Sequence, residues 1–327
     1  GCTKVMRAAV LFETIGCVSL APAQEAEDTV INVLQLGEVV VHGRSTGMRY
    51  EGFIRQVMDD TTFQHAFLNT RYFAHRVKSA FNVRDKKARE TASMYRTGNL
   101  YRKGSSAECI LDTAREVGKL RNGNGEFRFL TAEMYDDVFF PKGSFHASNT
   151  IASRNQEISR ESRFDKYKSE LKKFMFNPGQ EIASVPFIGD KLALFEPEMV
   201  PLYDFSIGTE FRNGHPCWVF GAVAKDTVGT GSGTGASYKL ADEDDTVIKR
   251  MKTWFDQETM NVMAREYRIM HESLLLDFDI TIRVENTIAA GDLVPTQVWY
   301  EGVWDIPFKK KEIVAFYLFY SDWQVGD

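Results

Sequence analysis

The sequence predicts an α+β protein dominated by antiparallel β-structure. From Leu276 to Glu285, apolar and polar residues alternate without a break, which is typical of a strand with one buried and one solvated face. Two more strand-like stretches flank a charged turn at 84–89, as expected for a hairpin. Clear helical periodicity is confined to about 50–69 and 161–176.

Length and composition limit the class of protein. The chain has 327 residues, of which 43% are hydrophobic, and its 24 Phe and 12 Tyr can fill a sizeable core. A net charge of -5 argues against a nucleic-acid binder, which normally carries a basic face. We find no apolar run of the ~18 residues that a membrane-spanning helix needs, so the chain is not expected to span a membrane.

Residues 1–23 read as a secretory signal peptide. Lys4 and Arg7 precede a short apolar stretch, and Ala21-Pro22-Ala23 is a small-residue cleavage site. One alternative is a buried first helix, and another is a lipoprotein acylated at Cys17. We therefore expect an exported protein that acts in the periplasm or at the outer membrane.

Residues 24–46 are predicted to be a loose leader containing one short strand. The β-prone run at 36–41 is expected to be an edge strand, although it also resembles the segment that opens many outer-membrane receptor plugs. If residues 1–23 are removed, the remaining cysteines are Cys109 and Cys217. An oxidising compartment would permit one disulfide between them, and two free thiols are the alternative.

The middle of the chain mixes helices, hairpins and irregular segments. An apolar pattern at Phe53, Ile54, Val57 and Met58 indicates the first helix. The remaining expected elements are a hairpin of strands 72–83 and 91–101, a turn at 122–125 leading into 126–130, a helix over 161–176 stopped at 177–179, and a proline-rich segment at 182–205 that cannot be a regular helix.

The C-terminal third reads as a meander of antiparallel strands. Its last strand, 313–320, is apolar on both faces and is therefore expected to be covered on both. The predicted strands are 217–224, 247–255, 260–270, 276–285, 293–300 and 313–320, with turns at 256–259 and 290–292.

No motif in the chain points clearly to catalysis. The glycine-rich run 229–235 lacks the Lys of a phosphate-binding loop, so we interpret it as a hairpin tip. The six histidines lack metal-ligand spacing, and no metal or cofactor is expected. Asp277 and Asp279 share one face of their strand, which favours solvated carboxylates over an acid/base pair. A hydrolase would need Asp204, Asp277 and Asp279 to converge.

The abundance of aromatic residues is the main compositional indication of function. Four tryptophans fall on predicted strands or strand ends, where they are either ordinary core or the lining of an apolar groove. The groove hypothesis selects Trp218, Phe220, Trp254, Phe278, Ile280, Ile282, Trp299, Phe316 and Leu318 as ligand-binding residues.

The C-terminal third also resembles a known superfamily. Trp254-Phe255-Asp256 with Thr259, Leu293-Val294-Pro295 after Gly291, and the closing strands through Trp323 are similar to the periplasmic lipoprotein-carrier superfamily of LolA-, LolB-, LppX- and RseB-like domains. The resemblance implies a half-open antiparallel β-barrel with helices across its concave face. It also implies a single domain over 47–327, with an insertion at about 130–210. In that superfamily the space between the barrel and its helices holds acyl chains or a hydrophobic partner.

These observations favour an exported, non-enzymatic binder or carrier of a hydrophobic ligand, such as a lipid or a lipoprotein acyl chain. An alternative is a cell-envelope module that binds another protein. A hydrolase is the minor alternative.

Overall fold

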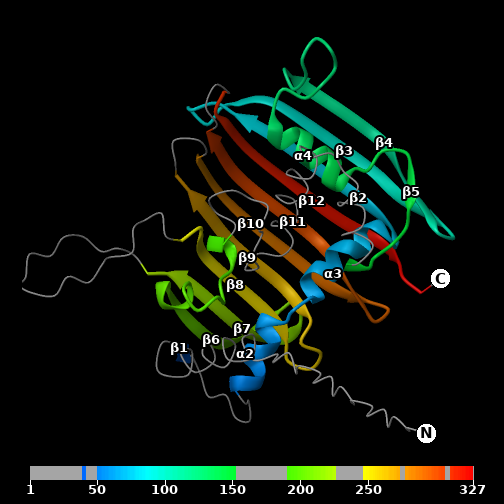
Figure 1. Ribbon diagram of the computed structural model, residues 1–327. Helices are drawn as coiled ribbons and strands as arrows, with labels where there is room; N and C mark the ends of the chain where they lie inside the picture. The colour runs from blue at the N-terminus through cyan, green and yellow to red at the C-terminus, as the bar shows by residue number, and fades with distance from the viewer. Residues whose placement is uncertain are drawn as a thin grey trace, which may run out of the picture.

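The structure, a computed structural model, describes residues 39–41, 50–151, 190–225, 246–272, 277–305 and 310–326. All strands in this part of the chain belong to one twelve-stranded sheet (Figure 1). In spatial order they are β1 (Val39–Val41), β6 (Tyr203–Arg212), β7 (His215–Ala224), β8 (Ile248–Asp256), β9 (Val262–His271), β10 (Asp277–Ala289), β11 (Asp292–Asp305), β12 (Glu312–Gln324), β2 (Ala74–Arg84), β3 (Glu90–Lys103), β4 (Ser106–Gly118) and β5 (Ser144–His146).

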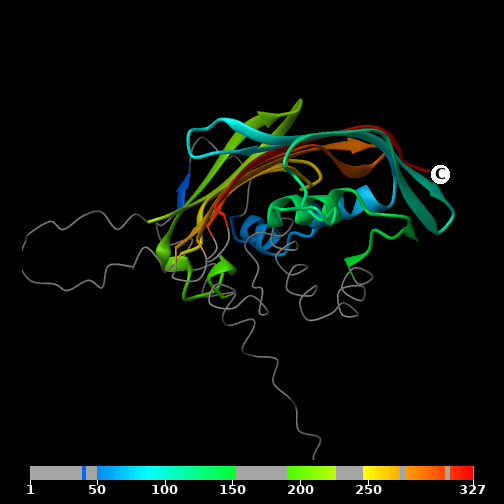
Figure 2. The same ribbon diagram turned by 90° about the horizontal axis from the view of Figure 1, so that it is seen from above.

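The sheet is antiparallel except at one edge. Strands β6 to β12 follow one another along the chain, and β12 then pairs with the N-terminal strand β2. Of the strands that the structure describes, only β1 runs parallel to its neighbour, β6. Figure 2 shows the sheet arching over the helices, which lie beneath its concave face. The predicted α+β, mostly antiparallel half-open barrel with helices across the concave face is therefore confirmed.

The helices that cover the concave face are short. Among the described residues they are α2 (Tyr50–Met58), α3 (Thr62–Leu68) and α4 (Leu130–Phe139), accompanied by the 3₁₀ turns η2 (Asn69–Arg71), η3 (Asp190–Leu192) and η4 (Val200–Leu202). The helix predicted over 50–69 is thus two helices. The break follows from Asp60, whose carboxylate accepts a hydrogen bond from the Thr62 backbone N–H (2.9 Å) at the start of α3.

Most predicted strands are confirmed within a few residues, including the hairpin β2–β3, the meander β7–β12 and the edge strand β1. The turn at 122–125 is also confirmed. Sequence reasoning missed β4, β5, β6 and α4. The predicted helix at 161–176, the glycine-rich run at 229–235 and residues 1–23 lie outside the described residues.

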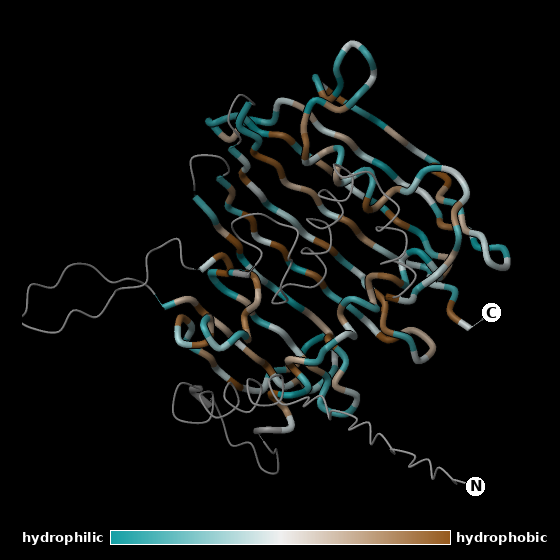
Figure 3. Tube along the Cα trace, in the orientation of Figure 1, coloured by the Kyte–Doolittle hydropathy of each residue, from teal (hydrophilic) through white to brown (hydrophobic). Residues whose placement is uncertain are grey.

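The period of two predicted for the strands is visible as alternating brown and teal segments in Figure 3. In β12 the concave side chains Phe316 and Leu318 are buried, with 4% and 0% of their surface exposed. On the convex side, Tyr317 and Phe319 are 38% and 36% exposed. The expectation that the last strand is covered on both faces is therefore wrong for its convex face. Among the described residues, no helix is long and apolar enough to cross a membrane.

Candidate functional site

A continuous apolar wall lines the concave face of the sheet. Cross-strand register places Ile282 opposite Tyr300, and Tyr300 opposite Phe316. The rings of Tyr300 and Phe316 stack with centroids 4.5 Å apart and planes 2° from parallel. Phe316 is in turn opposite Phe81 on β2. Directly opposed side chains share a face of the sheet, so this wall runs unbroken over β10, β11, β12 and β2.

Helix α4 covers part of this wall. The Tyr135 ring packs 5.0 Å from both Phe81 and Phe316, measured between centroids. Its hydroxyl donates a hydrogen bond to the Ser79 hydroxyl on β2. Burial raises the pKa of Tyr135 well above its usual value, so the phenol stays neutral. Tyr135 therefore closes the wall with an apolar ring and one polar contact.

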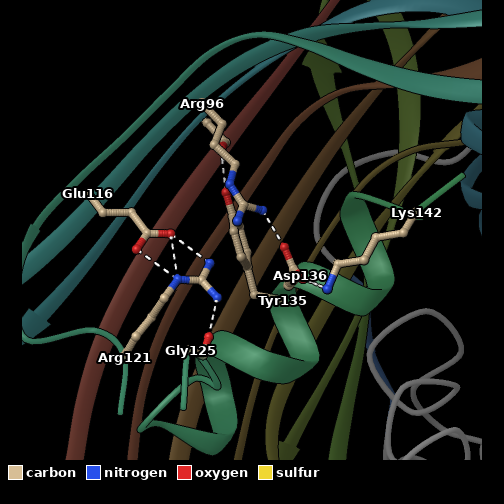
Figure 4. Close-up of polar contacts among 8 residues, drawn as sticks. Arg96, Glu116, Arg121, Gly125, Tyr135, Asp136 and Lys142 are labelled. Carbon is tan, nitrogen blue, oxygen red and sulfur yellow. Dashed lines mark hydrogen bonds and ion pairs between the residues drawn. The ribbon is translucent and has the colours of Figure 1, made fainter. Parts of the chain in front are cut away.

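A buried ion pair fastens α4 to the sheet. Arg96 of β3 projects from the concave face and donates to the Asp136 carboxylate, and both side chains are about 5% exposed (Figure 4). The exposed Lys142 ammonium lies 3.0 Å from the other Asp136 oxygen. The Arg96 guanidinium also lies 5.1 Å from the centre of the Phe140 ring. Its Nε has no hydrogen-bond partner among the described residues, so the pair is imperfectly satisfied within an apolar setting.

The loop that leads into α4 has its own polar anchor. The Arg121 guanidinium donates to both Glu116 carboxylate oxygens and to the Gly125 carbonyl (Figure 4). The hydrogen bonds from Arg121 lower the pKa of Glu116. The contact is largely solvent-exposed, so we expect it to orient the loop more than to stabilise the fold.

Helices α2 and α3 form a second cover with the same kind of anchor. Phe53 of α2 packs against Trp218 and Phe255, at ring centroid distances of 6.4 and 5.7 Å. Between α2 and α3, the Asp60 carboxylate lies 3.3 Å from Nη2 of Arg265, and both side chains are 5% exposed. Burial lowers the pKa of Arg265, with the Asp60 charge acting in the opposite direction. Each cover is thus tied to the sheet by one buried Arg–Asp pair.

Seven of the nine residues that the groove hypothesis selected lie on the concave side. Phe220 and Ile282 are 0% and 1% exposed, and Trp218 is partly buried against the same core. Among them, Trp218 contacts Phe53 of α2, and Phe316 contacts Tyr135 of α4. The concave seven are Trp218, Phe220, Phe278, Ile280, Ile282, Phe316 and Leu318.

Trp254 and Trp299 lie on the convex face, which corrects their assignment to the same lining. Trp254 follows one residue after a concave position, so strand alternation turns it outward. Its ring packs under the Arg212 guanidinium (4.6 Å), and its Nε1 donates to Glu210 (2.7 Å). Trp299 packs against Arg283 in the same way (4.7 Å).

Sequence reasoning missed the two Arg–Asp anchors. Arg96 stands in the apolar phase of β3, between Met94 and Leu100, and Arg265 shares a face with the buried Tyr267 and Ile269. A charged residue at a position where the alternation demands an apolar one was the available signal. The positions of the Asp partners are set by the tertiary structure.

The carboxylates that a hydrolase would need do not meet. Asp204 lies on β6, whereas Asp277 and Asp279 lie on β10, with three strands between. Asp279 pairs instead with Arg268 (2.7 Å) on the neighbouring strand. No cluster of residues that could hold a metal ion occurs in the described ranges.

A His–Asp pair does occur near a cysteine. The His215 Nδ1 lies 2.9 Å from Asp256, whose other oxygen accepts the backbone N–H groups of Glu258 and Thr259 in the β8–β9 turn. The nearby Cys217 is fully buried, and burial raises its thiol pKa to about 11. A buried thiol that stays protonated is a poor nucleophile, so we interpret the pair as structural.

Comparison with known proteins gives only distant likenesses. No family model matches the chain, and no curated protein matches it. Among solved structures, the chain is similar to an outer membrane lipoprotein-sorting protein domain from Vibrio parahaemolyticus, at 11% identity and a TM-score of 0.25, covering 81% of this chain and 93% of that one.

Two further solved structures show a likeness of the same order. A LolA superfamily protein from Nitrosomonas europaea has 14% identity and a TM-score of 0.24, with 82% and 93% of the two chains covered. A DUF1329 family protein from Desulfovibrio piger has 10% identity and a TM-score of 0.23, with 81% and 93% covered.

Proposed function

We propose that this protein binds a hydrophobic ligand, such as a lipid or an acyl chain, between the concave face of its sheet and the covering helices. The observation that carries the proposal is the pairing of an unbroken apolar wall with covers that are anchored at isolated buried polar points. In the described state the covers occupy the wall, so a ligand replaces Tyr135 of α4 or Phe53 of α2 as it enters.

The free energy of such an exchange favours a hydrophobic ligand. Lifting α4 off the wall exposes apolar surface, which costs roughly 25 cal/mol per Å². An acyl chain that covers the same wall recovers that free energy, whereas a polar ligand does not. The Arg96–Asp136 pair adds little net stability because its members are desolvated, so it sets the position of α4 without locking it irreversibly.

Fluorescence quenching tests where a ligand binds. A fatty acid brominated on its chain quenches tryptophan fluorescence by contact. Titration with it should therefore quench the fluorescence of Trp218 and leave that of Trp299, on the convex face, unchanged. We therefore expect Trp218→Phe to reduce the quenched fraction of the total emission and Trp299→Phe to increase it. Equal loss of emission from both tryptophans, or no quenching at saturating lipid, would contradict the proposal.

A second experiment asks whether the covers control entry. Asp136→Asn removes the charge that holds Arg96, and should accelerate uptake of the brominated fatty acid. Asp279→Asn, which disrupts an ion pair on the convex face, is the matched control and should leave the uptake rate unchanged. Native mass spectrometry of the purified protein then shows whether lipid is carried from the cell.

We also propose that the protein is exported, non-enzymatic and active in the cell envelope. The support is the residue pattern of 1–23, with a basic start, a short apolar stretch and a small-residue cleavage site. Mass spectrometry of the mature N-terminus tests this. Cleavage after Ala23 fits a periplasmic protein, whereas diacylglycerol on Cys17 would establish a lipoprotein.

A second candidate function is an envelope module that binds another protein, and the convex face favours it. Tyr95 and Tyr101 of β3 are 45% and 54% exposed, and Tyr317 and Phe319 are exposed on the neighbouring part of the sheet. Contiguous exposed apolar groups can mark a protein–protein contact site. Capture from native envelopes by wild-type protein, compared with a Tyr317→Ser/Phe319→Ser variant, tests this candidate.

A further inference from the structure

Strand β4 leaves a long open edge on the sheet. It spans thirteen residues, but β5 pairs only with Ser106, Ala107 and Glu108. Within the described residues, no strand pairs with the outer side of 109–118. Figure 1 shows β4 at the margin of the sheet with β5 at one end of it. Residues 110–118 are all exposed. An open edge of this length readily accepts another strand.

The pairing of β4 with β3 shows which way its side chains point. Ile110 is opposite Asn99, and Thr113 is opposite Thr97, whereas Leu111 is opposite Gly98. Asp112 is therefore an extra residue, and the Asp112 carboxylate lies 2.9 Å from Arg76 of the convex face. The bulge places Asp112 and Thr113 on the same face. The convex side of β4 thus carries Ile110, Asp112, Thr113, Arg115 and Val117.

This arrangement makes the edge complementary to a second copy of itself. If two β4 strands pair antiparallel about a two-fold axis at Ala114, Arg115 of each copy faces the Asp112–Thr113 bulge of the other. Ile110 then faces Val117, on the same side of the sheet. Every opposed pair shares a face, as a β-ladder requires. The bulge is what makes this possible, because without it Asp112 and Arg115 would lie on opposite faces.

The ends of the free edge also match. In this register Cys109 of one copy meets Gly118 of the other, so each end of the unpaired stretch coincides with the opposite end in the partner. Beyond Glu108 the edge is occupied by β5, and beyond Gly118 the chain leaves the sheet. The self-pairing is therefore closed by two-fold symmetry and limited to two copies.

We propose that the protein forms a homodimer through antiparallel pairing of its β4 edges about Ala114. The sheet then continues across both copies, with two Asp112–Arg115 charge pairs and two Ile110–Val117 apolar pairs at the seam. This surface is separate from the concave face, so it stands independently of the proposed ligand.

Sedimentation velocity of the full chain over a wide range of concentrations tests the dimer. The wild type should show a monomer–dimer equilibrium, and Ile110→Lys/Val117→Lys should raise the dissociation constant by roughly tenfold or more, because lysines block edge pairing. Val223→Lys, at an exposed convex position on β7, is the matched control and should leave the constant unchanged.

Cross-linking tests the register without depending on a disruptive variant. Ala114→Cys places two thiols opposite one another at about 4.5–5.5 Å between Cα atoms, within reach of a disulfide. Oxidation with diamide should cross-link Ala114→Cys into a covalent dimer far faster than Val223→Cys. A monomer at every concentration, a dimer insensitive to the lysine variant, species that grow beyond two copies, or equal cross-linking at both positions would overturn the proposal.

Discussion

The Glu312 carboxylate on β12 caps the N-terminus of helix α4 by accepting hydrogen bonds from Thr131, although the two residues are 181 positions apart. The backbone N–H of Thr131 donates over 3.0 Å and its hydroxyl over 2.6 Å, and the Leu130 N–H donates to the other oxygen over 2.8 Å. Glu312 is 4% exposed. A strand residue thus supplies the acceptor that a helix usually finds in its own N-cap, which ties the position of α4 to the last strand.

Replacing Glu312 should therefore loosen α4. We expect Glu312→Ala to lower the free energy of unfolding by about 2 kcal/mol, because the buried Thr131 N–H and the partly buried Leu130 N–H lose their acceptor. Urea denaturation measures the loss, and hydrogen exchange at residues 130–134 should rise at the same time. Glu301→Ala, a half-exposed glutamate on β11, is the control and should change stability by less than about 0.5 kcal/mol. Unchanged exchange in α4 would show that the cap is dispensable.

The Arg96–Asp136 pair should be costly to break from one side. Asp136→Asn leaves the Arg96 charge buried without a counter-ion, and we expect a loss of about 3–5 kcal/mol in unfolding free energy. The Lys142 side chain, which contacts the same carboxylate, is 81% exposed. Lys142→Met should therefore lower the free energy of unfolding by less than about 1 kcal/mol. Equal effects of the two substitutions in urea denaturation would contradict the buried assignment.

Protonation of His75 should lower the stability of the fold as the pH falls. Its ring is buried between Tyr320 and Trp323, and its Nδ1 donates to the Phe73 carbonyl (2.8 Å). Burial lowers its pKa to about 4, with the Phe73 hydrogen bond acting in the opposite direction. The unfolded chain binds this proton more readily, so the stabilisation present above about pH 6.5 is lost as the pH falls toward 4, by up to roughly 3 kcal/mol. His75→Phe should flatten the stability profile between those pH values, and an unaltered slope would exclude His75 as its source.

Both described cysteines should remain free thiols that react slowly. Cys109 lies on β4 and Cys217 on β7, with seven strands of the sheet between them, so no disulfide joins them. Burial raises the pKa of each thiol to about 11. We expect little reaction of either with a disulfide reagent in native protein at neutral pH, and rapid reaction in denaturant. A fast-reacting native thiol, located by mass spectrometry at Cys109 or Cys217, would contradict this.

The position of the Tyr300 ring requires glycine at position 302. The Tyr300 ring lies across Gly302, where a Cβ would overlap its hydroxyl oxygen, and that oxygen accepts a hydrogen bond from Trp304 Nε1 (2.7 Å). Gly302→Ala should therefore cost about 1–3 kcal/mol by displacing the Tyr300 ring. In contrast, a Cβ at Gly52 in α2 meets nothing within 4 Å, and Gly52→Ala should stabilise by about 0.5–1 kcal/mol. Thermal denaturation of both variants measures the difference in sign.

The strands of the hairpin β2–β3 and of the meander β7–β12 were predictable because their signal is local. In β10 the alternation that places Phe278, Ile280 and Ile282 on one face is a property of adjacent residues, so it can be recognised without knowledge of distant contacts. Helix α4 was missed for the opposite reason. Its N-terminus is completed by Glu312 and its Asp136 by Arg96, which are both remote in sequence.

The sequence by itself determined that the C-terminal third is an antiparallel meander and that strand 276–285 has one buried and one solvated face, since side-chain alternation follows from backbone geometry. Only the tertiary structure decided which aromatic residues share the concave wall, that Trp254 and Trp299 lie on the other side, and that buried Arg–Asp pairs anchor the covers. Those features depend on strand order and on contacts between segments far apart in the chain, and neither is encoded in local periodicity.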